Sequence, residues 1–486
     1  MSKVDTAWLH MEQPTNLMMI NGVIIMDEHL DYERLLETIE QRFLTFRRFR
    51  QKVVDTARGA YWVIDEDFDI RCHVRRTALP GAADQEELEL LVSQLASTPL
   101  DTSKPLWQIY VVENYVEGPV ILTRIHHCIA DGIALVQVFL SLTDPTPEGR
   151  PSAKKPEVWK KRRADESRVF QRLLDPARGG LDFATHLGAR MIQEGSKMLE
   201  NPAIAGNYAK EAGEIVRELA HSLTLENDPI TRFKGQLGTR KRVAWAEPLP
   251  LDEVKAVSKA FGCTVNDVLI AAVTGAVREY MVAAGDDPDG LEDIRATVPV
   301  NLRPLEHAQE LGNHFGLVFL SLPLSMGNPL ERLYAVNDRM NELKSSKQAA
   351  VTLGFLGALG MGPSAVQKPV LDMLSQKATA VLTNVPGPQQ PLYLAGSQMK
   401  EMMFWVPQNG NIGLGISILS YNGKVFFGLI SDYRLVSEPS AIISRFKQEF
   451  EKLLYLGMML PLEGRPATAT AETLLTKSLD DDLPGA

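Results

Sequence analysis

The stretch that decides the fold is Arg124-Ile125-His126-His127-Cys128-Ile129-Ala130-Asp131-Gly132. The preceding residues 118–123 begin with a Gly-Pro turn signal and continue with β-branched and apolar residues. This pattern predicts a strand. Residues 133–140 are long and apolar enough for a buried helix, although periodicity alone is ambiguous there. The two histidines therefore lie where a strand ends and a helix begins, a common position for reactive groups on a rigid scaffold.

The two adjacent histidines allow more than one interpretation. Successive side chains on a strand point to opposite faces, so His126 and His127 cannot both reach one substrate atom. The same alternation counts against a metal site built from this pair and Asp131, and we predict no bound metal. A neutral imidazole is the commonest general base near neutral pH, which favours one catalytic and one structural histidine. The alternative is two structural histidines, and in either case we expect Asp131 to cap the following helix.

Composition and charge limit the class of protein. The chain has 486 residues, of which 45% are hydrophobic and 23% charged, as in a soluble globular protein of two domains. A net charge of -10 argues against a general nucleic-acid binder. The three cysteines form neither a zinc spacing nor a disulfide framework, which suits a reducing cytoplasm. We expect no signal peptide, and no uninterrupted apolar run is long enough to span a bilayer.

The order of patterns along the chain predicts two α/β domains that face each other across a cleft. We expect an N-terminal subdomain at 1–145, a charged and largely helical linker at 146–235, a C-terminal subdomain at 236–462 and a disordered tail at 463–486. Within the first subdomain, helices are expected over residues 30–54, ending in a basic cluster, and over residues 84–96.

Two surface features have open interpretations. The run Lys160-Lys161-Arg162-Arg163 is either a solvated part of the linker or a site that attracts anionic lipid or a nucleotide phosphate. The uncharged stretch between Lys347 and Lys368 is either a core helix or a segment that rests on a lipid surface.

A capping-box spacing stands at the start of an apolar helix that we expect to run to about residue 281. Thr264 and Asp267 are three residues apart, and mutual capping accounts for both. Asn266 is left over in the first turn, where its amide could donate a hydrogen bond to a developing negative charge.

Four motifs together resemble one family. The spacing HHxxxDG in residues 126–132 is similar to the signature of CoA-dependent acyltransferase folds, a superfamily that includes the condensation domains of peptide synthetases. The combination with three further motifs, in this order, resembles the bacterial wax ester synthase/acyl-CoA:diacylglycerol acyltransferase family. These motifs are Pro105-Leu106-Trp107, Asn266-Asp267 and Asn384-Val385-Pro386-Gly387-Pro388. The resemblance implies two chloramphenicol-acetyltransferase-like subdomains with mixed sheets flanked by helices, and an active-site tunnel at their interface.

The resemblance also implies a reaction. Acyl-CoA would be a substrate, with no cofactor, and the acceptor would be a long-chain alcohol or diacylglycerol. His127 would take the proton from the acceptor hydroxyl and then protonate the leaving CoA thiolate, without an acyl-enzyme. Such an enzyme would be cytoplasmic and could contact a membrane or lipid inclusion peripherally.

Roles for the other motif residues follow from the same resemblance. Asp131 would hold the loop, with Arg303 as our candidate partner, and Gly132 would permit a tight turn and close backbone approach. Asn266 would stabilise the oxyanion or orient the alcohol, while Asp267 would hold the start of its helix. The segment Pro105-Leu106-Trp107 would shape the acyl pocket or the domain core, and burial is typical of a large aromatic such as Trp107.

The chain departs from the family pattern near its N-terminus, and three alternatives stay open. Many members carry a Pro-Met-His-Val segment where this chain has Pro14-Thr15-Asn16-Leu17-Met18-Met19-Ile20, which puts acceptor preference in doubt. Cys128 raises a rival mechanism, a cysteine nucleophile assisted by His126. The other rivals are an amide-forming condensation-type acyltransferase and a non-catalytic lipid-binding protein on the same fold.

Overall fold

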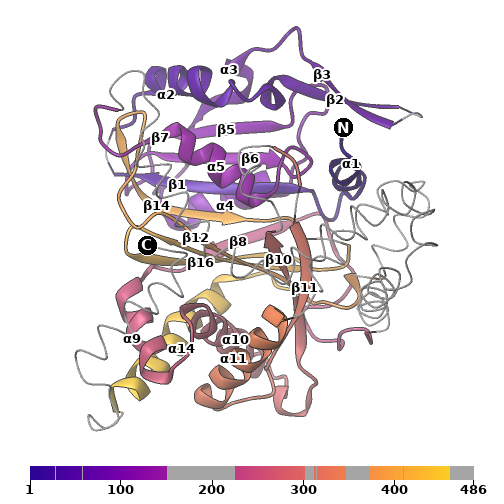
Figure 1. Ribbon diagram of the computed structural model, residues 1–486, viewed down its shortest axis with the longest axis vertical. Coiled ribbons are helices and arrows are strands. Elements are labelled where there is room, and N and C mark those ends of the chain that lie inside the picture. Colours follow the sequence, from indigo (N-terminus) through magenta and orange to yellow (C-terminus); the bar gives the residue numbers. More distant parts are fainter. Residues whose placement is uncertain are drawn as a thin grey trace, which may run out of the picture.

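The computed structural model describes residues 1–27, 29–56, 59–149, 225–301, 311–313, 315–345, 373, 375–408 and 410–459. Within these ranges the chain forms two large mixed sheets with helices packed against them (Figure 1). This is the α/β architecture that the sequence predicts. Arg303, the basic run 160–163, the uncharged stretch 347–368 and the tail 463–486 lie outside the described residues.

The first sheet contains seven strands. Their spatial order is β4 (Val74–Thr77), β5 (Trp107–Val112), β6 (Val120–His126), β1 (Met19–Met26), β14 (Ser397–Trp405), β13 (Tyr393–Leu394) and β7 (Thr143–Asp144). Strand β1 lies in the interior, antiparallel to β6 on one side and to β14 on the other, and nearly all its side chains are buried. Burial on both faces fits its mainly apolar sequence.

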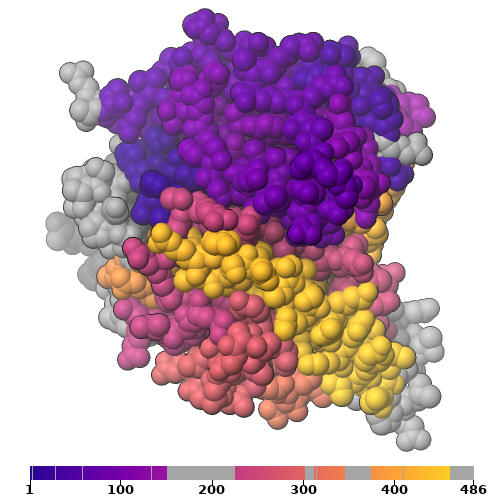
Figure 2. Space-filling model, turned by 180° about the vertical axis from the view of Figure 1, so that it is seen from behind, coloured from indigo at the N-terminus to yellow at the C-terminus, as the bar shows by residue number. Residues whose placement is uncertain are grey.

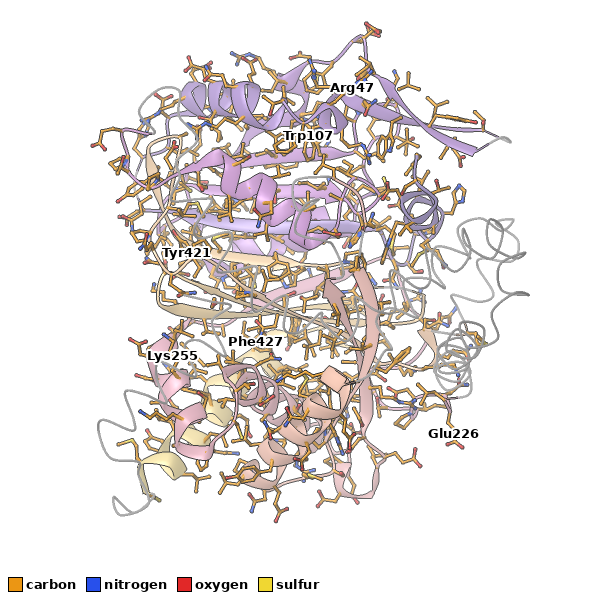
Figure 3. All side chains as sticks on the ribbon, in the orientation of Figure 1. Arg47, Trp107, Glu226, Lys255, Tyr421 and Phe427 are labelled. Atoms are coloured by element: carbon orange, nitrogen blue, oxygen red, sulfur yellow. The ribbon has the colours of Figure 1, made fainter. Side chains whose placement is uncertain are left out.

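The second sheet also has seven strands. Its order is β11 (Phe315–Leu322), β10 (Ile294–Asn301), β12 (Ala380–Pro386), β15 (Leu414–Tyr421), β16 (Lys424–Asp432) and β8 (Lys241–Trp245), with β9 (Leu249–Pro250) also paired to β16. Strands β10, β12 and β15 are parallel neighbours. Four helices pack beside this sheet (Figure 1), namely α9 (Leu251–Phe261), α10 (Val265–Ala283), α11 (Pro329–Ser345) and α14 (Ser440–Met459). Phe427 of β16, labelled in Figure 3, packs with its ring centroid 4.2 Å from that of Phe446 of α14.

Two strands from the second half of the chain lie in the first sheet. Strands β13 and β14 fall within the range 236–462 expected for the C-terminal subdomain, yet β14 pairs with β1 over Asn21↔Trp405 to Met26↔Met399. The first sheet therefore combines strands from both halves of the sequence. Figure 2 shows that residues late in the described chain, in yellow, also lie directly against the N-terminal half.

The helix predicted over residues 30–54 is wrong beyond residue 38. Helix α2 (Tyr32–Thr38) is followed by a π-helical turn (Ile39–Phe43) and a 3-10 turn (Arg47–Arg50). Strand β2 (Gln51–Thr56) then pairs with β3 (Gly59–Ile64). The β-branched pair Val53-Val54 favours the strand, and the basic cluster therefore lies on the 3-10 turn and not at the end of an α-helix.

The other short elements of the described chain complete both halves. The first half contains α1 (Lys3–His10), α3 (Ile70–His73), α4 (Gln85–Ala96) and α5 (Gly132–Leu142), and the second half contains the 3-10 turn Pro288–Gly290. Helix α4 confirms the helix predicted over residues 84–96. No single helix in the described ranges is long and apolar enough to cross a membrane, although the bent pair α9 and α10 passes by length and composition.

Helix α4 covers the edge of the second sheet with side-chain oxygens. Ser97 accepts a hydrogen bond from the backbone N–H of Lys241 (2.8 Å), and Ser93 accepts one from Val243 (3.0 Å). Glu89, four residues further back, accepts from the N–H of Trp245 (3.2 Å). Three alternate N–H groups of the edge strand β8 are thus satisfied by the other half of the chain.

A buried ion pair lies at the same junction. Lys241 Nζ is 3.1 Å from Asp432 Oδ2 and 2.8 Å from Asn16 Oδ1, and all three side chains are buried. Asn16 Nδ2 in turn donates to the carbonyl oxygen of Gly410 at 2.7 Å. The segment that departs from the family pattern, Pro14 to Ile20, therefore helps to join the two halves.

Candidate active site

Neighbouring strands hold the backbone of the His-His loop. The N–H of His126 donates to the carbonyl of Leu106 (3.0 Å), and the N–H of His127 donates to that of Met18 (2.7 Å). The N–H of Asp131 donates to the carbonyl of Gly312 (3.2 Å), which comes from the second half of the chain. The loop is therefore fixed from three sides, at the junction of the two halves.

His126 is held by hydrogen bonds through both ring nitrogens. Its Nε2 is 3.0 Å from Glu12 Oε2, and its Nδ1 accepts the backbone N–H of Cys128 at 3.1 Å. A nitrogen that accepts an N–H carries no proton, so the proton of His126 resides on Nε2 and is donated to Glu12. Burial is the largest single influence and opposes ionisation of Glu12, but the hydrogen bond and charge of His126, the backbone N–H of Met18 and the charge of Arg124 together outweigh it and lower the pKa of this carboxyl. His126 is fully engaged, as expected of a structural residue.

His127 lies between aromatic rings. Its ring stacks on Trp8 with centroids 4.2 Å apart, and the centroid of Phe315 lies 5.5 Å away. Nδ1 is buried and has no hydrogen-bond partner in the described part of the chain. Burial lowers the pKa of His127 from 6.5 to about 4, against the opposing effect of the Asp131 charge. The imidazole is therefore neutral at physiological pH.

The N-terminal segment around helix α1 supports both histidines. Asp5 and Trp8 lie on α1, and Glu12 follows shortly after its end. Trp8 stacks on His127, Glu12 binds His126, and Asp5 accepts a hydrogen bond from Asn313, which itself donates to the backbone oxygen of His127. The sequence prediction missed these residues. Their spacing of three and four, typical of one face of a helix, was the signal that could have revealed them.

Asp131 caps helix α5, as predicted. Its Oδ1 accepts the N–H of Ala134 at 2.8 Å, and its side chain is buried. Gly132 is the first residue of α5, shortly after a turn at residues 127–129, and its φ angle is not positive, so its backbone conformation does not itself require a glycine. A Cβ built on Gly132 would meet no described atom within 4 Å. The space beside this residue is therefore open among the described residues.

Cys128 is fully buried, with an exposed fraction of 0%. A sealed sulfur cannot reach a substrate carbonyl without rearrangement of the loop, which counts against the cysteine-nucleophile mechanism. Within the described ranges, no three His, Cys, Asp or Glu side chains gather as metal ligands.

The segment Pro105-Leu106-Trp107 lies in the core of the first half. Trp107 is fully buried and donates its Nε1 proton to the carbonyl of Phe49 at 2.8 Å (Figure 3). Its ring stacks on His73 with centroids 4.5 Å apart. The segment supports the histidines from behind, because Leu106 accepts the N–H of His126 and Trp107 pairs with Ile125 across the ladder.

Asn266 is joined to Asn384 of the fourth motif. The Nδ2 group of Asn384 donates to Asn266 Oδ1 at 2.6 Å, and among the described residues no acceptor is found for the Nδ2 group of Asn266. The predicted capping box is confirmed, since the side chains of Thr264 and Asp267 each accept the other's backbone N–H. Asn266 therefore lies in the first turn of α10 in a fixed position. It makes no hydrogen bond with His127, and Arg303 lies outside the described residues.

Comparisons with known proteins show the family to which the chain belongs. The model of the wax ester synthase/diacylglycerol acyltransferase catalytic domain matches residues 1–269, and that of the corresponding C-terminal domain matches residues 311–454. The chain belongs to the wax ester synthase/diacylglycerol acyltransferase family. Its activity is therefore that of an acyltransferase, and the predicted family is confirmed.

Two similar proteins show how far the likeness extends. A probable diacylglycerol O-acyltransferase of Mycobacterium tuberculosis (strain ATCC 25618 / H37Rv) is 27% identical over 87% of this chain and 88% of its own length. The wax ester synthase/diacylglycerol acyltransferase from Marinobacter aquaeolei VT8 shares the fold, with a TM-score of 0.64 and 20% identity over 94% of this chain and 98% of its own.

More distant structures share only the fold. The starter condensation domain of rhizomide synthetase, solved with C8-CoA and Leu-SNAC, has a TM-score of 0.56 at 12% identity and covers 95% of each chain. The first condensation domain of the calcium-dependent antibiotic synthetase has a TM-score of 0.56 at 14% identity, over 94% of this chain and 95% of its own. The mixed-sheet α/β fold predicted from the sequence is thus confirmed.

Proposed function

We propose that this acyltransferase moves a long-chain acyl group from CoA to the hydroxyl of a fatty alcohol or diacylglycerol, with His127 as general base. The observation that carries the proposal is the state of His127, which is neutral, buried against the rings of Trp8 and Phe315, and without a hydrogen bond at Nδ1 among the described residues. An imidazole of this kind can accept a proton at one atom only. The names of the similar proteins support the acceptor class.

The reaction balances with His127 as the only proton carrier. Nε2 takes the hydroxyl proton while the acceptor oxygen attacks the thioester carbonyl and forms the new C–O bond. The tetrahedral intermediate then collapses, the C–S bond breaks, and the leaving CoA thiolate receives the same proton from Nε2. The Nδ2 group of Asn266 is our candidate donor to the oxyanion, and the open space beside Gly132 is our candidate for part of the tunnel.

A direct assay tests the proposal. The purified protein is incubated with labelled palmitoyl-CoA and, in separate reactions, hexadecanol, diacylglycerol or hexadecylamine. We expect thiol release together with a labelled wax ester or triacylglycerol. An amide as the main product would favour the condensation-type alternative, and thiol release without any lipid product, or no release at all, would contradict O-acyl transfer.

We also propose that the enzyme works at the cytoplasmic surface of a membrane or lipid inclusion. Both proposed acceptors partition into lipid, so the enzyme must meet them at a lipid surface. Co-flotation of the protein with diacylglycerol-containing vesicles tests this proposal, and a protein that stays entirely at the bottom of the gradient would contradict it.

The pH dependence of kcat/KM provides the first prediction. His127 acts as a base only when neutral, and because burial lowers its pKa to about 4, it stays neutral down to about pH 5.5. We therefore expect kcat/KM to change by less than about two-fold between pH 7.5 and 5.5. A histidine with the ordinary pKa of about 6.5 would lose about ten-fold over the same interval. Circular dichroism at each pH controls for unfolding, and a ten-fold loss without unfolding would contradict the assignment.

The second prediction concerns Asn266. Substitution Asn266→Ala removes the proposed oxyanion donor, and we expect kcat to fall on the order of a hundred-fold with little change in KM for acyl-CoA. The matched control is Asn341→Ala, since Asn341 is an exposed residue on α11 that contacts Asn337. Steady-state kinetics distinguish the outcomes, because an effect on KM alone would indicate a binding role.

A further inference from the structure

The carboxylate of Glu12 lies beside the reactive loop and accepts two hydrogen bonds through one oxygen. Its Oε2 is 3.0 Å from Nε2 of His126 and 3.2 Å from the backbone nitrogen of Met18. The Glu12 side chain is 27% exposed, whereas that of His126 is 3% exposed. A carboxylate oxygen has lone pairs for both donors, and hydrogen bonds to a charged acceptor are stronger than bonds to a neutral one. Glu12 therefore reaches from a partly exposed position into the interior of the fold.

A tight turn brings Glu12 alongside Met18. Gln13 and Asn16 pair with each other through N–H···O distances of 3.1 and 2.9 Å, so the chain reverses its direction between them. Pro14 is the second residue of this turn, a position that proline favours because its ring fixes φ. After the reversal, the Glu12 side chain meets the N–H of Met18. Local turn chemistry therefore establishes the first of the two contacts.

The two residues that donate to Glu12 hold the backbone on both sides of His127. Met18 uses its carbonyl oxygen to accept the N–H of His127 at 2.7 Å. His126 uses Nδ1 to accept the N–H of Cys128 at 3.1 Å, and this nitrogen therefore carries no proton. The peptide groups before and after His127 are thus both bound by residues that Glu12 holds.

We propose that Glu12 is a positioning residue for acyl transfer, which fixes the backbone of His127 through Met18 and His126. Glu12 needs no contact with substrate in this role and exchanges no proton during the reaction. It holds the His126 tautomer with the proton on Nε2, because only this form donates to Glu12 and accepts from Cys128. The precision matters for the rate, since displacement of a reacting group by about 1 Å can cost about a hundred-fold.

The tautomer of His126 tests the inference in the unmodified protein. In protein with ¹⁵N-labelled histidine, ring nitrogens with and without a proton differ in chemical shift, and the signals are assigned to His126 from its own backbone resonances. We expect a proton on Nε2 and none on Nδ1 at pH 7.5. A proton on Nδ1 would overturn the proposal, because the connection from Glu12 to the N–H of Cys128 would then be broken.

Three substitutions of Glu12 separate the length of the side chain from its charge. Glu12→Ala removes both hydrogen bonds, and we expect kcat to fall about ten-fold or more, with KM for palmitoyl-CoA and hexadecanol within about two-fold of the wild type. Glu12→Gln keeps an oxygen at the same reach and should restore kcat to within about three-fold. Glu12→Asp keeps the charge but is one methylene shorter, so it should resemble Glu12→Ala. Restoration of kcat by Asp and not by Gln would show an electrostatic role and overturn the proposal.

Asp55→Ala is the matched control. Asp55 Oδ2 is 2.9 Å from Nε2 of His10, so this is a second carboxylate–histidine pair that involves the end of α1. The described hydrogen bonds and ion pairs of the Asp55 side chain do not reach residues 126–131. We therefore expect this variant to keep the wild-type kcat, and a loss equal to that of Glu12→Ala would overturn a role specific to Glu12.

Amide hydrogen exchange provides a readout that does not depend on turnover. The N–H groups of Met18 and Cys128 should exchange faster in Glu12→Ala and return to the wild-type rates in Glu12→Gln, because the variant with an oxygen restores both contacts. A folded Glu12→Ala protein in which either kcat or these two exchange rates stay unchanged would overturn the inference. If Glu12→Ala does not fold, the comparison between Glu12→Gln and Glu12→Asp decides it.

This inference rests on the proposed role of His127, but the two fail differently. If the wild-type protein transfers no acyl group while amide exchange in the loop depends on Glu12 as expected, the proposed function is wrong and the positioning of the loop stands. If transfer requires His127 but is indifferent to Glu12→Ala, only the positioning role is wrong.

Discussion

His127→Ala is expected to lower the rate of acyl transfer from CoA by a hundred- to ten-thousand-fold, the usual contribution of a positioned acid-base group. The variant removes the only atom proposed to take the hydroxyl proton and return it to the thiolate. His126 cannot substitute, because its Nδ1 accepts the N–H of Cys128 and its Nε2 binds Glu12. Release of free CoA thiol and formation of labelled lipid measure the loss.

Cys128→Ala is the matched control for this prediction. Cys128 is adjacent in sequence and fully buried, so its removal disturbs the same loop without touching the proposed proton path. We expect this variant to retain most of the activity. A fully active His127→Ala protein, or an inactive and folded Cys128→Ala protein, would show that the proposed mechanism is wrong.

Lys241→Met is expected to destabilise the protein by about 3–5 kcal/mol, the usual cost of breaking one side of a buried ion pair. Lys241 and Asp432 have side-chain exposures of 4% and 0%, so the substitution leaves a carboxylate in the interior without its cation. It also removes the donor to Asn16 Oδ1. Urea unfolding followed by tryptophan fluorescence measures the change as a shift in the transition midpoint.

Lys400→Met provides the comparison. Lys400 Nζ lies 3.3 Å from Glu117 Oε2, but the two side chains are 36% and 50% exposed. Exposed pairs contribute about 1 kcal/mol or less, so this variant should unfold close to the wild-type midpoint. Equal midpoints for the two variants would contradict the importance of the buried pair.

Local features of the site could be predicted from the sequence because their partners are near in the chain. The Asp131 cap reaches only to Ala134, and the capping box joins Thr264 to Asp267. The His-His motif also had a recognisable spacing. These patterns follow from helix geometry and need no knowledge of the tertiary fold.

Long-range partners could not be predicted in this way. Asn313 is 186 residues from His127, and Glu12 is 114 residues from His126, so no local pattern relates them. The position of β14 beside β1 has the same cause, since pairing between distant strands depends on packing of the whole chain. The helix predicted over residues 30–54 failed because strand pairing with β3 overrode the amphipathic pattern.

The hydrogen bonds from Glu89, Ser93 and Ser97 to strand β8 have a geometric consequence. Four residues of an α-helix advance roughly 6 Å, and two residues of a strand advance roughly 7 Å. Every fourth helix residue can therefore face every second strand residue over this short contact. A displacement by a single residue in either element would leave all three N–H groups without acceptors at once. The two halves of the chain therefore cannot slide past each other by small steps. The position of Asn313 and Phe315 relative to His127 is fixed by this register.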